Sequence, residues 1–157
     1  MNNVAKRFST AGMKLLWAAE TTAGTRPTKG YVEIPEIKEM PALNVQPNTI
    51  DATPLSEEEY VLYVEGLKDL GGALGYRANL SDKLITAWTA VMTAHDTAVK
   101  DGKDIWFCIT HPKLEMATYF VGDPSDLGLD AASVGSVLET TLYITPNSAP
   151  IRAAKPN

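Results

Sequence analysis

The sequence predicts a mostly β protein, an antiparallel β-sandwich or open barrel flanked by a single α-helix. Only residues 81–100 have apolar side chains that recur at three- and four-residue spacings, as one face of a helix requires. Several shorter segments alternate apolar and polar side chains and are separated by turn residues. One amphipathic helix among about seven or eight strands has to place its apolar stripe on a sheet.

Length and composition favour one domain over residues 1–157. The chain is 45% apolar, which is enough for a core of its own. No apolar run is long enough to span a membrane, and the N-terminus lacks the apolar core and cleavage site of a signal peptide. Cys108 is the only cysteine, so neither a disulfide framework nor a cysteine-rich zinc site is expected.

The first strand is expected over residues 12–20, with Met13, Leu15 and Trp17 on one face. Residues 60–67 are also expected to be a strand. A tight turn at Lys68 and Asp69 then leads into residues 70–80. One face of that next strand carries Leu70, Leu74, Tyr76 and Leu80.

The helix has clear signals at both ends. Ser81 is a favourable N-cap residue, and Asp82 places a negative charge in the first turn. Lys100 lies in the last turn, and Gly102 suits the left-handed conformation that ends a helix. The predicted apolar stripe consists of Leu84, Ile85, Trp88, Val91, Met92, His95 and Val99.

Three strands are expected after the helix. Residues 105–110 and 115–121 should form a hairpin around a turn at 111–114. A loop over 122–132 then leads to a last strand at 137–145, which Pro146 ends. The polar, proline-rich end from about residue 147 is expected to be flexible.

Residues 31–55 are predicted to form an extended, hairpin-like arm. Four prolines in or beside this segment remove donors that a central strand pair needs. Its apolar side chains are spread thinly, so they should be covered by another subunit, and the rest of the domain should fold without residues 36–48. The expected assembly contacts in the arm are Val32, Ile34, Ile37, Met40, Leu43, Val45 and Ile50.

A second expected contact surface lies on the strand before the helix. Gly71, Ala73 and Gly75 fall on one face of that strand, together with Arg77 and Asn79. A face of small residues allows another backbone or a neighbouring subunit to approach closely. The glycines do not fit a phosphate-binding loop, because no Gly-Lys-Ser/Thr follows them and no helix begins directly after them.

The net charge of −5 is unevenly distributed. Residues 20–65 contain nine carboxylates against three cations, whereas the remainder is close to balance. A protein that grips phosphates would have the opposite sign in its charged surface. Specific nucleic-acid binding is therefore not expected.

No residue pattern indicates catalysis, a cofactor or a metal. His95 lies on the helix stripe and His111 in a turn, where structural roles are expected, because a lone histidine lacks the cluster that a metal needs. Cys108 lies between apolar neighbours, where a buried, inert thiol is expected. The acids at 57–59 are adjacent, whereas a calcium loop spaces its ligands around a glycine. We expect no enzymatic activity.

Three segments resemble the major tail tube proteins of long-tailed, siphovirus-type bacteriophages. They are residues 49–53 (TIDAT), 66–72 (GLKDLGG) and 138–146 (LETTLYITP), and the resemblance extends over roughly residues 12–150. It implies a structural virion protein that self-assembles into homohexameric rings. The rings would stack into the tail tube, the channel for DNA ejection into the host.

The resemblance also implies partners and a location. The protein would bind copies of itself, and the tape measure, tail terminator and distal tail proteins would contact the tube. Genomic DNA would pass through without specific binding, and the acidic balance suits a channel that repels phosphate. The protein would be made in the bacterial cytoplasm and end in the virion tail.

Two other functions remain open at this stage. One is a tube ring protein of a contractile tail or of a type VI secretion-like system, which sequence separates poorly from a siphovirus tube. The other is a monomeric β-sandwich binding module, which would need aromatic side chains clustered on an exposed face. Trp17, Trp88 and Trp106 lie instead within apolar stripes, which argues for the core.

Overall fold

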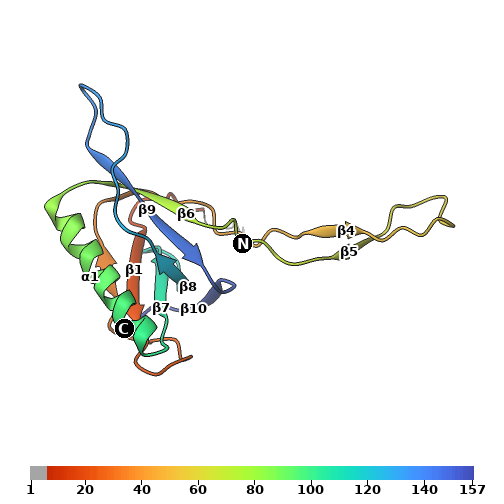
Figure 1. Ribbon diagram of the computed structural model, residues 1–157, viewed down its shortest axis with the longest axis horizontal. Helices are drawn as coiled ribbons and strands as arrows, with labels where there is room; N and C mark the ends of the chain where they lie inside the picture. The colour runs from red at the N-terminus through yellow and green to blue at the C-terminus, as the bar shows by residue number, and fades with distance from the viewer. Residues whose placement is uncertain (1–6) are drawn as a thin grey trace, which may run out of the picture.

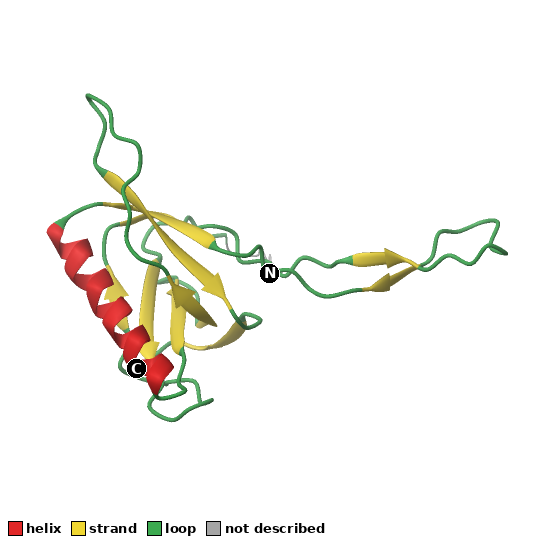
Figure 2. Ribbon diagram, in the orientation of Figure 1, coloured by secondary structure: helices red, strands yellow, loops and turns green. Residues whose placement is uncertain are grey.

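The computed structural model describes residues 7–157 and contains ten strands and one helix in that range (Figures 1 and 2). The helix and the longer strands form a compact body, from which a thin two-stranded hairpin projects. The elements in chain order are β1 (Lys14–Ala19), β2 (Val32–Ile34), β3 (Ile37–Glu39), β4 (Thr49–Asp51), β5 (Tyr63–Glu65), β6 (Leu74–Asn79), α1 (Asp82–Lys100), β7 (Ile105–Thr110), β8 (Met116–Pro124), β9 (Glu139–Pro146) and β10 (Ile151–Ala154).

The body is a nearly closed antiparallel barrel with one helix, as the sequence predicted. Seven strands follow the order β2-β1-β7-β8-β9-β6-β3, and β10 adds to β8 outside that path. The two edge strands, β2 and β3, are consecutive in the chain. A turn that contains Glu36 at a φ of 67° joins them, and the carbonyl of Glu36 accepts a hydrogen bond from the amide of Asn79 on β6. This turn brings the chain from one edge of the sheet to the other.

Strand β8 forms the corner of the barrel. Residues 118–121 pair with β7, whereas Gly122 begins the pairing with β9. A Cβ on Gly122 would lie 2.6 Å from Ile144 Cγ2, so only glycine fits where the strand changes partner. The predicted loop at 122–132 therefore starts later, because β8 continues to Pro124.

Helix α1 begins and ends as the sequence predicted. The hydroxyl of Ser81 accepts a hydrogen bond from the amide of Leu84, and Gly102 has a φ of 67° just after the last turn. The buried helix residues are Leu84, Trp88, Val91 and Ala98. Ile85 and Val99 are exposed, so the stripe is narrower than predicted, and a smaller residue, Ala98, occupies its C-terminal end.

The main core fills the space enclosed by the strands and α1. It combines Leu15 of β1 and Phe107 of β7 with Tyr76 of β6, Leu142 of β9 and Trp88 of α1. A smaller cluster covers the opposite face of β7 and β8, where Trp106, Cys108, Ala117, Tyr119 and Val121 are buried. Because β7 is covered on both faces, its sequence reads as a continuous apolar run rather than a strict alternation.

The projecting arm consists of residues 46–69, later in the chain than predicted. Strands β4 and β5 pair antiparallel in the projecting hairpin (Figure 1), with Ile50 opposite Val64. A bridge between Gln46 and Asp69 marks the root of the arm. The segment 60–67, predicted to be a strand of the body, is thus the returning half of the arm. Its alternation is that of a strand, but it pairs only with β4.

Residues 31–43 belong to the body. Ile34 is buried in the main core, and Ile37, Met40 and Leu43 pack against that core. The structure therefore contradicts the prediction that these four side chains lack cover within one chain. It also contradicts the expectation that the body folds without residues 36–48, because β3 and three core contacts lie there. The prolines end short strands, but the segment still packs against the body.

The C-terminal segment is ordered, contrary to the prediction of a flexible end. Strand β10 pairs with the first half of β8, with Ile151 opposite Tyr119 and Ala154 opposite Met116. The Tyr119 hydroxyl donates to the carbonyl of Ala154 over 2.6 Å. Backbone pairing supplies the order that the polar composition did not suggest.

Candidate assembly surfaces

The arm carries more of the exposed large apolar side chains than any other segment of residues 7–157. Leu55 and Leu67 are 107% and 88% exposed, and both faces of the hairpin carry uncovered side chains. The exposed apolar residues of the arm and its root are Val45, Ile50, Leu55, Tyr60, Val61, Leu62, Tyr63, Val64 and Leu67. Exposed apolar side chains gathered in one segment are typical of an interaction site.

Hydrogen bonds hold the arm as a continuous ribbon up to its tip. Gln46 and Asp69 exchange both backbone bonds, the amide of Gly66 donates to the carbonyl of Asn48, and that of Ala52 donates to Leu62. A two-stranded hairpin is marginally stable alone, and both of its edges offer free backbone groups. The arm is thus shaped for a contact but is not stabilised by the body of its own chain.

The tip of the arm is acidic. Glu57 Oε1 accepts backbone bonds from Glu59 and Tyr60, and these bonds hold the pKa of Glu57 below its usual value. Asp51 accepts a bond from the amide of Thr53, and hydrogen bonds from Thr53 likewise lower its pKa. Glu57 and Asp51 therefore stay ionised well below neutral pH.

The arm carries the whole net charge of the chain. Residues 46–69 contain six carboxylates and one lysine, a net charge of −5, which equals the total. The remaining residues balance, with thirteen cations and thirteen carboxylates. The acidic stretch that the sequence located at 20–65 is thus mainly a property of the arm.

An apolar groove opens beside the root of the arm. It has a volume of about 600 Å³ and lies between the segment that follows β3 and the near ends of β1, β7 and β8. Apolar side chains form the centre of its lining, and polar and charged side chains complete it. The apolar ones are Met13, Ile37, Met40, Pro41, Leu43 and Ile109, and the others are Thr10, Lys38, Glu39 and Thr118. Three of the predicted assembly residues thus line a surface hollow while they also pack on the core.

A basic end of the body adjoins this groove. Residues 7–14, 111–115 and 151–155 meet there: His111 Nε2 lies 2.6 Å from the carbonyl of Ser9, and Lys14 and Lys155 line one hollow of about 260 Å³. The basic end has five cations and a single acid, Glu115. The five are Arg7, Lys14, Lys113, Arg152 and Lys155. Gly12 lines both this hollow and the apolar groove.

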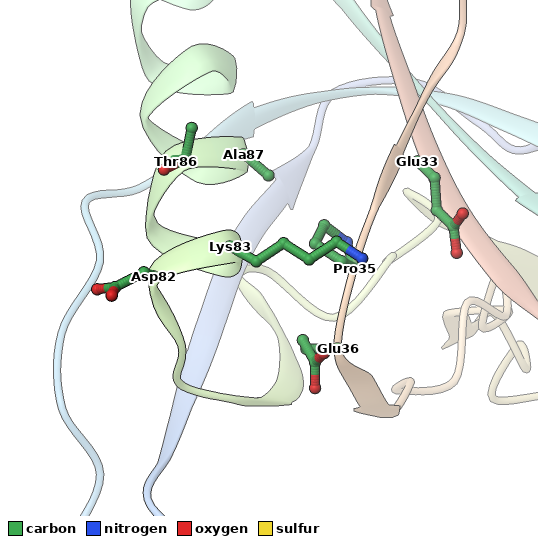
Figure 3. Close-up of a pocket in the computed structure, with 7 residues that line it drawn as sticks. All are labelled: Glu33, Pro35, Glu36, Asp82, Lys83, Thr86 and Ala87. Atoms are coloured by element: carbon green, nitrogen blue, oxygen red, sulfur yellow. The ribbon is translucent and has the colours of Figure 1, made fainter.

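The turn between β2 and β3 forms a third hollow with the start of α1, of about 580 Å³ (Figure 3). Lys83 extends across it toward Pro35, while Asp82 points away. Glu33 and Glu36 complete the charged lining. This mixed, open surface has no set of polar groups that converge on one point.

The small-residue face of β6 is partly filled within the chain. A Cβ on Gly75 would lie 2.8 Å from Thr141 Cγ2, so a cross-strand neighbour already makes the close approach. Arg77 binds Glu39 at 2.9 Å and Glu139 at 2.5 Å, and Lys38 binds the same Glu139 at 2.6 Å. Gly71 and Ala73 are exposed just before β6. Of the assembly contacts predicted in residues 31–55, the exposed ones are Val32, Val45 and Ile50.

The candidate chemical residues occupy structural positions. Cys108 is fully buried, and burial raises the pKa of its thiol to about 11. The amide of Lys113 donates to His111 Nδ1, so Nε2 carries the proton that is donated to Ser9. His95 Nε2 lies 3.2 Å from Asp123. Among residues 7–157, no three His, Cys, Asp or Glu side chains gather as a metal would require, and no helix is long and apolar enough to cross a bilayer.

Glu20 is a buried carboxylate that the sequence did not single out. It accepts hydrogen bonds from Trp106 Nε1 and from the amides of Asp104 and Gly24, at 2.9, 2.9 and 3.1 Å. Burial disfavours its ionised form, but these donors outweigh burial and lower the pKa of Glu20. It joins the end of β1 to the start of β7 and serves the fold.

The fold is shared with components of a phage-related particle. No family model and no curated protein matches the sequence. A chain in the sixfold-symmetrised cryo-EM structure of the anti-feeding prophage baseplate matches with a TM-score of 0.64 and 9% identity, over 96% of this chain and 98% of that one. A chain of the anti-feeding prophage tube-terminating cap matches with a TM-score of 0.56 and 10% identity, over 98% and 96%. At sequence identities of 9% and 10%, this similarity establishes a shared fold.

Proposed function

We propose that this protein is a structural component of a phage-like tail and forms rings that stack into a tube. The single observation that carries the proposal is the arm. It exposes apolar side chains on both faces, which a lone domain leaves uncovered. The shared fold supports the same role, because its neighbours come from the baseplate and the tube-terminating cap of one prophage particle.

Of the two tail types, we favour a ring protein of a contractile tail or secretion-like system. The two structural neighbours described above both belong to an anti-feeding prophage particle. The siphovirus tube protein is the second candidate, on the strength of the sequence motifs at 49–53, 66–72 and 138–146. A sheath gene beside this one, or a sheath protein that co-purifies with the particle, would decide for the first candidate.

The binding-module and enzyme alternatives have less support. Trp88 and Trp106 are buried and Trp17 is half-buried, so these rings form no exposed aromatic platform. Cys108 and His111 are buried as well. We propose that the protein has no catalytic role, and that contacts with tape measure, terminator and distal proteins follow from its place in a tube.

Negative-stain microscopy of the purified protein at increasing concentration tests the proposal. We expect rings or tubes of uniform diameter, and sixfold symmetry in end views would support the hexamer. Analytical ultracentrifugation should show a large species forming at the expense of the monomer. A protein that stays monomeric at every concentration and salt level tested would contradict the tube proposal.

A further inference from the structure

We propose that the acceptor for the arm is the basic end and the adjoining apolar groove of a second copy of this chain. The inference rests on the proposed assembly role and names the surface that the arm contacts. The β4 and β5 strands would lie in the apolar groove, and the acidic tip would lie over the lysine-lined hollow. Each part of the arm then meets a surface of matching chemistry.

Charge complementarity is the first argument. The arm has a net charge of −5, whereas the basic end has five cations against one acid, a surplus of four. Within residues 7–157, the ion pairs of the chain involve Lys38, Arg77 and His95, so none of them neutralises the basic end. Surfaces with opposite net charges of this size orient two approaching copies and raise their rate of association.

The apolar groove supplies the second argument. Met13, Met40 and Leu43 line a hollow that no described residue of the same chain fills. Arg152 lies opposite Thr118 in the register of β8 and β10, and Thr118 lines this groove. Arg152 therefore stands near the groove that would receive β4 and β5, whose own acids are Asp51 and Glu65. The two charged residues that line the groove, Lys38 and Glu39, are already paired with Glu139 and Arg77. An apolar centre with a charged rim is the usual composition of a protein interface.

The test is a charge swap between the two surfaces. Glu58→Lys/Glu59→Lys changes the tip and spares Glu57, which orders the turn. Lys14→Glu/Lys155→Glu changes the acceptor. We expect each pair to raise the concentration needed for assembly by about tenfold or more. The four changes together restore the native net charge and should restore assembly.

The matched control is Lys83→Glu/Lys100→Glu, which gives the same net charge as the acceptor variant but changes two exposed residues of α1 that lie outside the basic end. It should assemble like the native protein. Two results would overturn the inference while leaving the tube proposal standing: normal assembly of both reversed variants, or failure of the combined variant to recover. A native protein that never assembles would instead count against the tube proposal itself, and against the docking with it.

Cross-linking gives a second readout that does not depend on assembly yield. Cys108 is buried and unreactive, so introduced cysteines react alone. Mixing a Val64→Cys copy with a Met13→Cys copy should give a disulfide-linked dimer on oxidation, because the two Cα atoms must then approach within about 7 Å. Val134→Cys, exposed on the loop between β8 and β9, should not cross-link to Met13→Cys. The opposite pattern would place a different segment in the groove.

Duplex DNA is the competing ligand for the basic end. If the native protein binds duplex DNA at physiological salt and Lys14→Glu/Lys155→Glu abolishes that binding, the cations of the basic end bind phosphate, and the docking inference is wrong. We expect no retention by either protein.

Discussion

At the scale of single residues, Trp88 has the largest fully buried side chain and joins the helix to the loop after β8. It is 1% exposed, and its Nε1 donates to the carbonyl of Ser125 over 2.9 Å. Trp88→Ala should lower the free energy of unfolding by about 3–5 kcal/mol, because it leaves a cavity and an unpaired carbonyl. Denaturant melts measure this loss. Ile85→Ala on the same helix, at a side chain 41% exposed, is the control and should lose under about 1 kcal/mol.

Glu20 gives the protein an acid-sensitive contact. Its folded pKa is lowered, so the stability it contributes is present above the pKa of the unfolded chain, about 4.3, and is lost as pH falls through the folded pKa. Glu20→Gln should cost about 1–3 kcal/mol at pH 7 and flatten the decline of stability below about pH 4. Melting curves at a series of pH values check both effects. Glu33→Gln, at an exposed site, should change neither the stability at pH 7 nor its decline below about pH 4.

At the scale of elements, the arm and the body should separate cleanly. Gln46 and Asp69 form a hydrogen-bonded pair, which an Asn-Gly turn can close directly. Replacing residues 47–68 by Asn-Gly should leave a folded monomer that makes no tubes, as circular dichroism and light scattering can show together. Tubes that still form would remove the arm from the interface.

A linker in place of residues 36–48 is the matched comparison. That segment includes β3 and the core contacts of Ile37, Met40 and Leu43. Its removal should destabilise the body, with a loss of several kcal/mol expected for three partly buried apolar side chains. Equal stability of the two deletions would mean that β3 contributes little to the barrel.

The sequence identified the elements whose signals are local. The cap at Ser81, the stripe at Leu84, Trp88 and Val91, and the alternation of β6 all depend on neighbours within one segment. The limits of the arm were misjudged because burial of Ile34 depends on β1, a partner outside its segment. Strand β10 was missed because its order comes from pairing with β8, which a polar composition does not reveal.

The sequence predicted a projecting arm with exposed apolar side chains, and the structure has such an arm at residues 46–69 and not at 31–55 (Figure 1). Exposed apolar side chains beside prolines indicated an assembly arm, and Val45 and Ile50 do lie on or beside it. Most of the stronger contributors, from Tyr60 to Leu67, were assigned to a strand of the body, because alternation does not distinguish a covered strand from an exposed one. The basic end joins three segments distant in sequence, so only the fold brings it together.

At the scale of the whole molecule, we expect no dependence on a metal. The nearest candidate, the acids at 57–59, lies at the tip of the arm, where Glu57 already accepts backbone bonds. Dialysis against a chelator should leave the melting temperature and the assembly unchanged. A drop in melting temperature that one specific cation reverses would reopen that site.

The separation of charge between the acidic arm and the basic end has a directional consequence. Two copies could satisfy both surfaces at once only by exchanging their arms reciprocally. Where the arm of one copy binds the acceptor of the next without such an exchange, the contact is heterologous, and copies add head to tail into closed rings or open fibres. A growing assembly of this protein would therefore have two unlike ends, one with unused acidic arms and the other with empty basic acceptors. Proteins that terminate the two ends would have to carry opposite charge.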